Sequence, residues 1–103
     1  MKVGTDGVVL GAWTEVNNAE TILDIGTGTG LIALMLAQKS QAAIDAIDID
    51  KVSYEQAREN FLRSNWSPRL AAFYFSLQDF SKSINRKYDL VVSNPPFFTD
   101  ASP

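Results

Sequence analysis

The chain has 103 residues, 46% of them hydrophobic, and a formal net charge of −3. The length predicts one small domain, and the hydrophobic content argues against a disordered chain. The absence of cysteine and histidine excludes disulfides, thiolate metal sites and histidine-based catalysis. No apolar run reaches the ~18 residues of a membrane span, and no signal-peptide core is present. We therefore expect a cytoplasmic protein that binds no metal and no membrane. The net charge of −3 also means that these residues lack the positively charged surface typical of nucleic-acid binding.

Short apolar runs alternate with segments of helical period along the chain. The opening segment 1–13 carries three glycines and predicts a loop. Strands are predicted at 21–25, 43–49, 70–75 and 89–93, and helices at 31–39 and 51–64. The first helix is apolar nearly all round, which predicts burial, and Asp50 is a plausible N-cap for the second. The order β-α-β-α-β-(loop or helix)-β predicts an α/β fold with a parallel sheet and helices on its faces.

Polar clusters follow every predicted strand. The sequence has Asp24 with 26–30 after the first strand, Asp48 and Asp50 after the second, 78–80 after the third and 94–97 after the fourth. The carboxyl ends of parallel strands share one edge of a sheet, and ligands bind beyond that edge in open α/β sheets. We therefore expect all four clusters at one ligand site.

The first cluster is the glycine-rich stretch "DIGTGTG", with glycines at 26, 28 and 30. Its spacing departs from the dinucleotide fingerprint, and no G-K-[ST] follows, which excludes a P-loop. Alternating glycines allow a sharp turn and close approach of a ligand. Asp24 beside them suits a cationic or amine-bearing ligand. A plain turn is the alternative.

Four further acids are candidates for this site. Asp48 lies about 20 residues on, where a carboxylate can accept both ribose hydroxyls of an adenosine. Asp45 and Asp50 compete for that role, but strand alternation puts Asp48 at the strand end, and Asp50 has the place of a helix cap. Considered alone, Asp79 is a surface acid.

Four motifs together resemble the class I S-adenosylmethionine-dependent methyltransferases: "LDIGTGTG" at 23–30, "AIDID" at 46–50, "QDF" at 78–80 and "SNPPF" at 93–97. The resemblance implies a Rossmann-like methyltransferase fold and the cofactor S-adenosyl-L-methionine. It implies that Gly26, Gly28 and Gly30 pass close to the methionine part and that Asp48 binds the ribose. Asp79 would accept the adenine amino group, and Phe80 would supply its backbone N–H.

The opening "MKVGTDGVVLGAW" narrows the match. It resembles the segment before the first strand in bacterial tRNA adenine-N6 methyltransferases, which modify the adenine beside the anticodon of valine tRNA. That likeness adds Lys2, Thr5 and Asp6 to the residues on the cofactor side. It implies a tRNA or other nucleic-acid substrate, held mainly by residues outside these 103.

The stretch "NPPF", Asn94 to Phe97, supplies the predicted catalytic residues. The Asn94 side-chain carbonyl and the Pro95 backbone carbonyl can accept the two N–H groups of an exocyclic amine and localise its lone pair. Pro95 and Pro96 restrict the backbone, so the acceptors are held in advance. Phe97 would stack on the flat base, worth about 1–3 kcal/mol. The alternative is that the prolines only end a strand and the aromatics fill a core.

The motif leaves the substrate open between adenine N6, guanine N2 and a protein glutamine, since each offers a planar nitrogen beside a π system. Phe97 favours a nucleic-acid base, and "KVGTDG" favours adenine N6. The relatives are over twice as long, so we expect residues 1–103 to be the N-terminal part of a single methyltransferase domain. A half-sheet with an open apolar edge is expected to be poorly stable alone. An inactive cofactor-binding fragment is therefore the second alternative.

Overall fold

The computed structural model describes residues 18–83 and 86–93. Strands and helices alternate there as the sequence predicts, and the segment left open as loop or helix forms a short helix. The elements are β1 (Thr21–Ile25), α2 (Leu31–Lys39), β2 (Ala43–Asp48), α3 (Lys51–Arg63), the 3-10 helix η2 (Ser67–Arg69), β3 (Leu70–Tyr74), α4 (Leu77–Ser83) and β4 (Leu90–Ser93).

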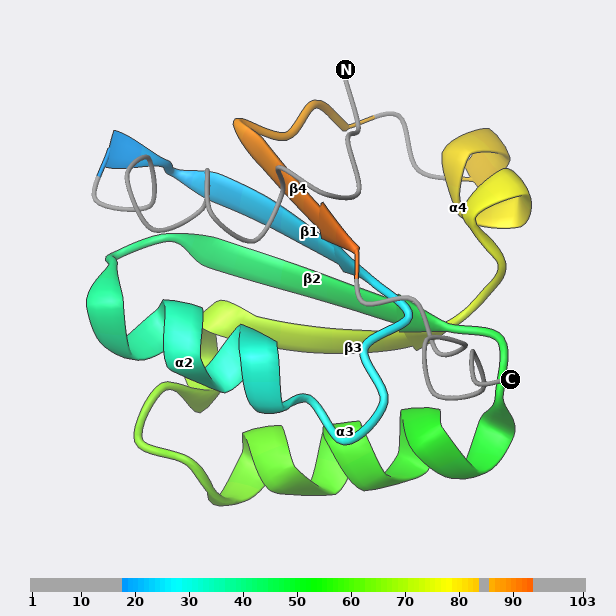
Figure 1. Ribbon diagram of the computed structural model, residues 1–103, viewed down its shortest axis with the longest axis horizontal. Coiled ribbons are helices and arrows are strands. Elements are labelled where there is room, and N and C mark those ends of the chain that lie inside the picture. Colours follow the sequence, from blue (N-terminus) through cyan, green and yellow to red (C-terminus); the bar gives the residue numbers. More distant parts are fainter. Residues whose placement is uncertain (1–17, 84–85, 94–103) are drawn as a thin grey trace, which may run out of the picture.

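The four strands form one sheet in the order β3-β2-β1-β4 (Figure 1). Every neighbouring pair is parallel, with Ile22 of β1 opposite Ile44 of β2 and Leu90 of β4. All four carboxyl ends therefore point to the same edge, which confirms the predicted parallel sheet. Each connection that leads away from this edge is available to hold a ligand.

The two faces of the sheet bury separate apolar clusters because strand side chains alternate between faces. The helices α2 and α3 cover one face (Figure 1). The helix α4 supplies Phe80 to the other face. The first cluster contains Ala19, Ile22, Ala33, Leu36, Ala37, Ala42, Ile44, Ala46, Ala57, Phe61 and Val92. The second contains Leu23, Ile47, Phe80 and Val91.

The helix α2 is less buried than its composition predicts. Ala33, Leu36 and Ala37 face the core, but Leu31 is 61% exposed and Met35 is 37% exposed. These two side chains are four residues apart and share a face of the helix. The expected burial all round is therefore wrong, because α2 packs on the sheet with only one side.

The helix α3 follows its sequence pattern closely. Asp50 caps it, since its side chain accepts a 3.0 Å hydrogen bond from the Ser53 N–H. Ala57 and Phe61 are buried on one face, as expected from their spacing. Tyr54 continues that face and stacks on Tyr74 of β3, with 5.8 Å between ring centroids. The carboxyl end of β3 is thereby tied directly to the start of α3.

Asp45 of β2 makes a polar contact on the sheet face opposite α2 and α3. It is buried and accepts hydrogen bonds from the Arg86 guanidinium and, at 2.6 Å, from the Tyr88 hydroxyl. Burial, with the Asp45 charge, raises the pKa of Tyr88 above its usual range, and the Asp45 charge raises the pKa of Arg86. Asp45 therefore anchors the segment before β4 and is turned away from the carboxyl edge.

The helices are short relative to a lipid bilayer. Across 18–83 and 86–93, no helix is long and apolar enough to cross a membrane.

Candidate cofactor site

The glycine-rich loop 26–30 leaves β1 at the carboxyl edge and is bonded to the end of β2. The N–H groups of Gly26 and Thr27 both donate to the Ile47 carbonyl, at 2.9 and 3.1 Å. On the other side of β2, the Phe75 N–H donates to the Asp48 carbonyl at 3.1 Å. The connections after β1, β2 and β3 thus meet at one edge, where the sequence predicts the site.

The loop needs glycine for its backbone conformation. Gly26, Gly28 and Gly30 have φ angles of 73°, 60° and 87°, a left-handed region that side chains with a Cβ rarely adopt. The surroundings of Gly28 and Gly30 differ. A Cβ on Gly28 would meet nothing within 4 Å, whereas a Cβ on Gly30 would lie 2.6 Å from Cε1 of Phe61. Gly28 therefore borders open space, and Gly30 is packed against α3.

Asp48 lies at the end of β2 and contacts this loop. Its Oδ2 accepts from the Gly28 N–H at 2.9 Å, and its Oδ1 accepts from the Asp50 N–H at 2.9 Å. Each carboxylate oxygen can accept a further hydrogen bond. Asp45 points to the other face and Asp50 caps α3, so Asp48 is the acid of the three that lies at the loop, as strand alternation predicts.

Asp24 is fully buried on the same face of the sheet as Asp48, at the base of the glycine-rich loop. The Thr27 hydroxyl donates to its Oδ2 at 2.8 Å, while its Oδ1 has no partner among the residues that the structure describes. Burial raises the pKa of Asp24 to about 6, against the hydrogen bond from Thr27, and the nearby Asp48 charge adds to the rise. A buried acceptor without a donor is suited to a positively charged amine.

The third connection holds Asp79 and Phe80 in the first turn of α4. Asp79 is exposed, and its N–H donates to Oγ of Ser76 at 3.0 Å. The Phe80 ring is buried, and its N–H donates to the Ser76 carbonyl at 2.9 Å. The adenine contacts expected of these two residues stay predictions. For Phe80 the structure adds a condition, because its N–H would have to leave this helical bond.

Seven predicted site residues lie outside the described part of the chain. They are Lys2, Thr5, Asp6, Asn94, Pro95, Pro96 and Phe97. Their roles stay predictions. The strand β4 ends at Ser93, directly before Asn94.

Two polar residues at the loop were missed by sequence reasoning. The Thr27 hydroxyl binds Asp24, and the Asn60 side-chain amide of α3 donates to the Thr29 carbonyl at 2.8 Å. Asn60 had one available signal: it sits on the helical face of Ala57 and Phe61, where an apolar side chain is expected.

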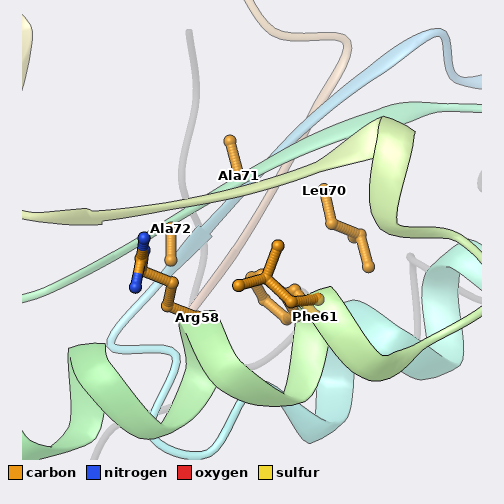
Figure 2. Close-up of a pocket in the computed structure, with 6 residues that line it drawn as sticks. Arg58, Phe61, Leu70, Ala71 and Ala72 are labelled. Carbon is orange, nitrogen blue, oxygen red and sulfur yellow. The ribbon is translucent and has the colours of Figure 1, made fainter.

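An open pocket of about 230 Å³ lies elsewhere, between α3 and the edge strand β3. Figure 2 shows Arg58 and Phe61 projecting from α3, with Leu70, Ala71 and Ala72 on β3. None of its lining residues belongs to the predicted site. In the described ranges, no group of three or more His, Cys, Asp or Glu is arranged to hold a metal ion.

Comparison with known families matches residues 7–102 to the methyltransferase small domain. The chain belongs to the methyltransferase small domain family. The matched range includes all the strands and helices of the described sheet.

Curated relatives of this chain are named tRNA1(Val) (adenine(37)-N6)-methyltransferase. The one from Trichodesmium erythraeum is 59% identical over 105 residues, which covers 99% of this chain and 44% of the relative. The one from Parabacteroides distasonis is 55% identical, covering 98% of this chain and 43% of the relative. The chain thus spans less than half the length of these relatives.

Solved structures share the fold of this methyltransferase domain. An RNA methyltransferase from Salinibacter ruber, in complex with S-adenosyl-L-homocysteine, superposes with a TM-score of 0.62 at 20% identity, covering 77% of this chain and 52% of that one. The domain therefore has the Rossmann-like fold of S-adenosylmethionine-dependent methyltransferases, as the resemblance implies.

The described residues fit the cofactor of that fold in three respects. Asp24 offers an unpartnered buried oxygen for an ammonium group, and Gly28 borders space that a side chain would occupy. Asp48 keeps acceptor capacity on both oxygens beside the loop. At this edge Asp24 thus fits the amine of the cofactor, Gly28 allows a close approach of the backbone, and Asp48 fits the ribose diol.

Proposed function

We propose that this chain forms the cofactor-binding part of an S-adenosylmethionine-dependent methyltransferase that modifies N6 of an adenine in tRNA. The observation that carries the proposal is the joining of Asp48 to the glycine-rich loop through Gly28, in a chain 59% identical to a curated tRNA adenine-N6 methyltransferase. As in that name, the substrate would be valine tRNA.

Each residue at the edge has a task in the proposal. Asp48 binds the ribose hydroxyls, Asp24 faces the amino group of the methionine part, and Asp79 accepts from the adenine amino group. Lys2 and Thr5 would add contacts on the cofactor side. The bound cofactor supplies a methyl group on a sulfonium, whose leaving group is already activated. The protein needs to align the reacting atoms rather than to remove a proton with a strong base.

The substrate end of the site is assigned to the four residues after β4. Asn94 and the Pro95 carbonyl accept the two N–H groups of the adenine amine, Pro96 stiffens the backbone, and Phe97 stacks on the base. A base inside folded RNA would have to turn out into this pocket. We place the reaction in the cytoplasm with tRNA as partner, bound largely by residues outside these 103.

The test is transfer of labelled methyl groups from S-adenosyl-L-methionine to valine tRNA, ribosomal RNA and a release-factor peptide. It is run on the 103-residue chain and on any longer product of its gene. We expect tRNA to be labelled on adenine N6 and Asn94→Ala to abolish the label. Label on guanine N2 or on the peptide glutamine would support one of the alternative substrates instead. Cofactor binding without any transfer would support a binding fragment.

A further inference from the structure

The peptide groups of the glycine-rich loop 26–30 differ in their hydrogen bonding. The peptide group between Thr27 and Gly28 is held at both ends, because the Gly28 N–H donates to Asp48 and the Thr27 carbonyl accepts from the Gly30 N–H at 2.9 Å. The peptide group between Thr29 and Gly30 is also held at both ends. Its N–H, that of Gly30, donates to the Thr27 carbonyl, and its carbonyl, that of Thr29, accepts from the Asn60 side chain. A planar peptide held at both ends cannot rotate freely.

The peptide group between these two is different. Neither the Gly28 carbonyl nor the Thr29 N–H has a partner within 18–83 and 86–93. This group also lies beside the open space at Gly28. Among the peptide groups inside the loop 26–30, this is the one whose N–H and carbonyl both lack a partner in the described residues, and a fixed peptide lies on each side of it.

Asn60 fixes the peptide group that follows the free Gly28–Thr29 peptide, and we call its hydrogen bond to the Thr29 carbonyl the clamp. Asn60 comes from α3, 31 residues away in sequence, and its amide donates to the Thr29 carbonyl at 2.8 Å. The same turn of α3 brings the Phe61 ring and the Ala57 methyl group against Gly30. Among these residues of α3, Asn60 is the polar one, and its hydrogen bond fixes the direction of the Thr29 carbonyl.

We propose that Asn60 is a positioning residue for the cofactor: through the Thr29 carbonyl it orients the free Gly28–Thr29 peptide for the methionine part. The inference rests on the proposed function, in which the loop lies beside that part. Asp48 and Asp79, at the ends of other strands, hold the adenosine part and do not depend on Asn60. Loss of the clamp should therefore weaken ligands that carry the methionine part and spare those that lack it.

The experiment compares S-adenosyl-L-homocysteine with adenosine by calorimetric titration. The variants are Asn60→Asp, which keeps the shape but turns a carboxylate toward the Thr29 carbonyl, and Asn60→Ala, which only removes the donor. Asn65→Asp is the matched control, because it makes the same change at an exposed residue for which the structure shows no side-chain hydrogen bond. All proteins are measured as the 103-residue chain and as any longer product of the gene, with their melting temperatures recorded.

We expect Asn60→Asp to weaken S-adenosyl-L-homocysteine about tenfold and Asn60→Ala somewhat less, while adenosine and the Asn65→Asp control change less than about twofold. An equal loss for both ligands, no loss for either, or failure of both Asn60 variants to fold would overturn the positioning role. A wild-type protein that binds neither ligand would overturn the proposed function and this inference with it. A wild-type protein that binds both ligands, with an unchanged Asn60→Asp variant, would overturn the inference alone.

Discussion

The Phe61 ring occupies the place that a side chain at Gly30 would need, with Cε1 2.6 Å from the ideal Cβ position. This contact fixes where α3 lies relative to the glycine-rich loop. It also separates two glycines that look alike in the sequence, because Gly28 faces open space instead.

Gly30→Ala and Gly28→Ala should therefore fail in different ways. Both place a Cβ on a left-handed backbone, which costs about 1 kcal/mol. Gly30→Ala adds a clash with a buried ring and should lower the free energy of unfolding by about 2–4 kcal/mol. Gly28→Ala should cost only the backbone part but should weaken S-adenosyl-L-homocysteine strongly. Urea unfolding and titration of each variant separate the two effects, and equal stability losses would contradict the assignment.

Asp48→Asn should weaken cofactor binding by about tenfold or more. The substitution removes the charge that accepts from Gly28 and replaces one acceptor with a donor, and hydrogen bonds to charged groups are worth about 1.5–3 kcal/mol. Asp50→Asn is the control two residues away. Asparagine caps helices about as well as aspartate, so the control should leave both stability and affinity nearly unchanged. An equal loss of affinity in both variants would point to a general effect of charge.

Asp24 should make folding stability depend on pH. Its pKa rises to about 6 in the folded chain from the ordinary 3.8, mainly through burial. Between about pH 4 and pH 6 the folded state thus holds a proton that the unfolded state has lost. The free energy of unfolding should fall by about 3 kcal/mol as the pH rises through this range, and then level off.

Asp24→Asn isolates this contribution, because it removes the Asp24 carboxyl group and leaves every other titratable side chain in place. We expect the difference in the free energy of unfolding, wild type minus variant, to decline from pH 4 to pH 6. A difference that is flat or that grows with pH would be incompatible with a buried carboxyl whose pKa is raised.

Tyr88→Phe should lower the free energy of unfolding by about 1 kcal/mol, since it removes one hydrogen bond to a buried carboxylate. Asp45→Asn, which removes the charge that Arg86 and Tyr88 share, should cost more. A double-mutant cycle between these two positions should give a coupling energy above about 0.5 kcal/mol. Additive losses would mean that the contact does not anchor the segment before β4.

The sequence by itself determined the order of elements, the parallel sheet and the edge that bears the site. Those features depend on local patterns: apolar runs for the strands, helical spacing at Ala57 and Phe61, and a cap at Asp50. Alternation along β2 was enough to separate Asp48 from Asp45, because side chains on a strand point to opposite faces in turn.

Only the tertiary structure decided the contacts that join distant parts of the chain. Asn60 reaches Thr29 across 31 residues, and Asp45 binds Tyr88 across 43. Three further features likewise depend on what packs nearby: the exposure of Leu31 and Met35, the contact of Phe61 with Gly30, and an Asp24 oxygen that has no partner within 18–83 and 86–93. Composition and period describe a residue's neighbours in sequence. Burial, pKa and hydrogen-bond partners are set by its neighbours in space.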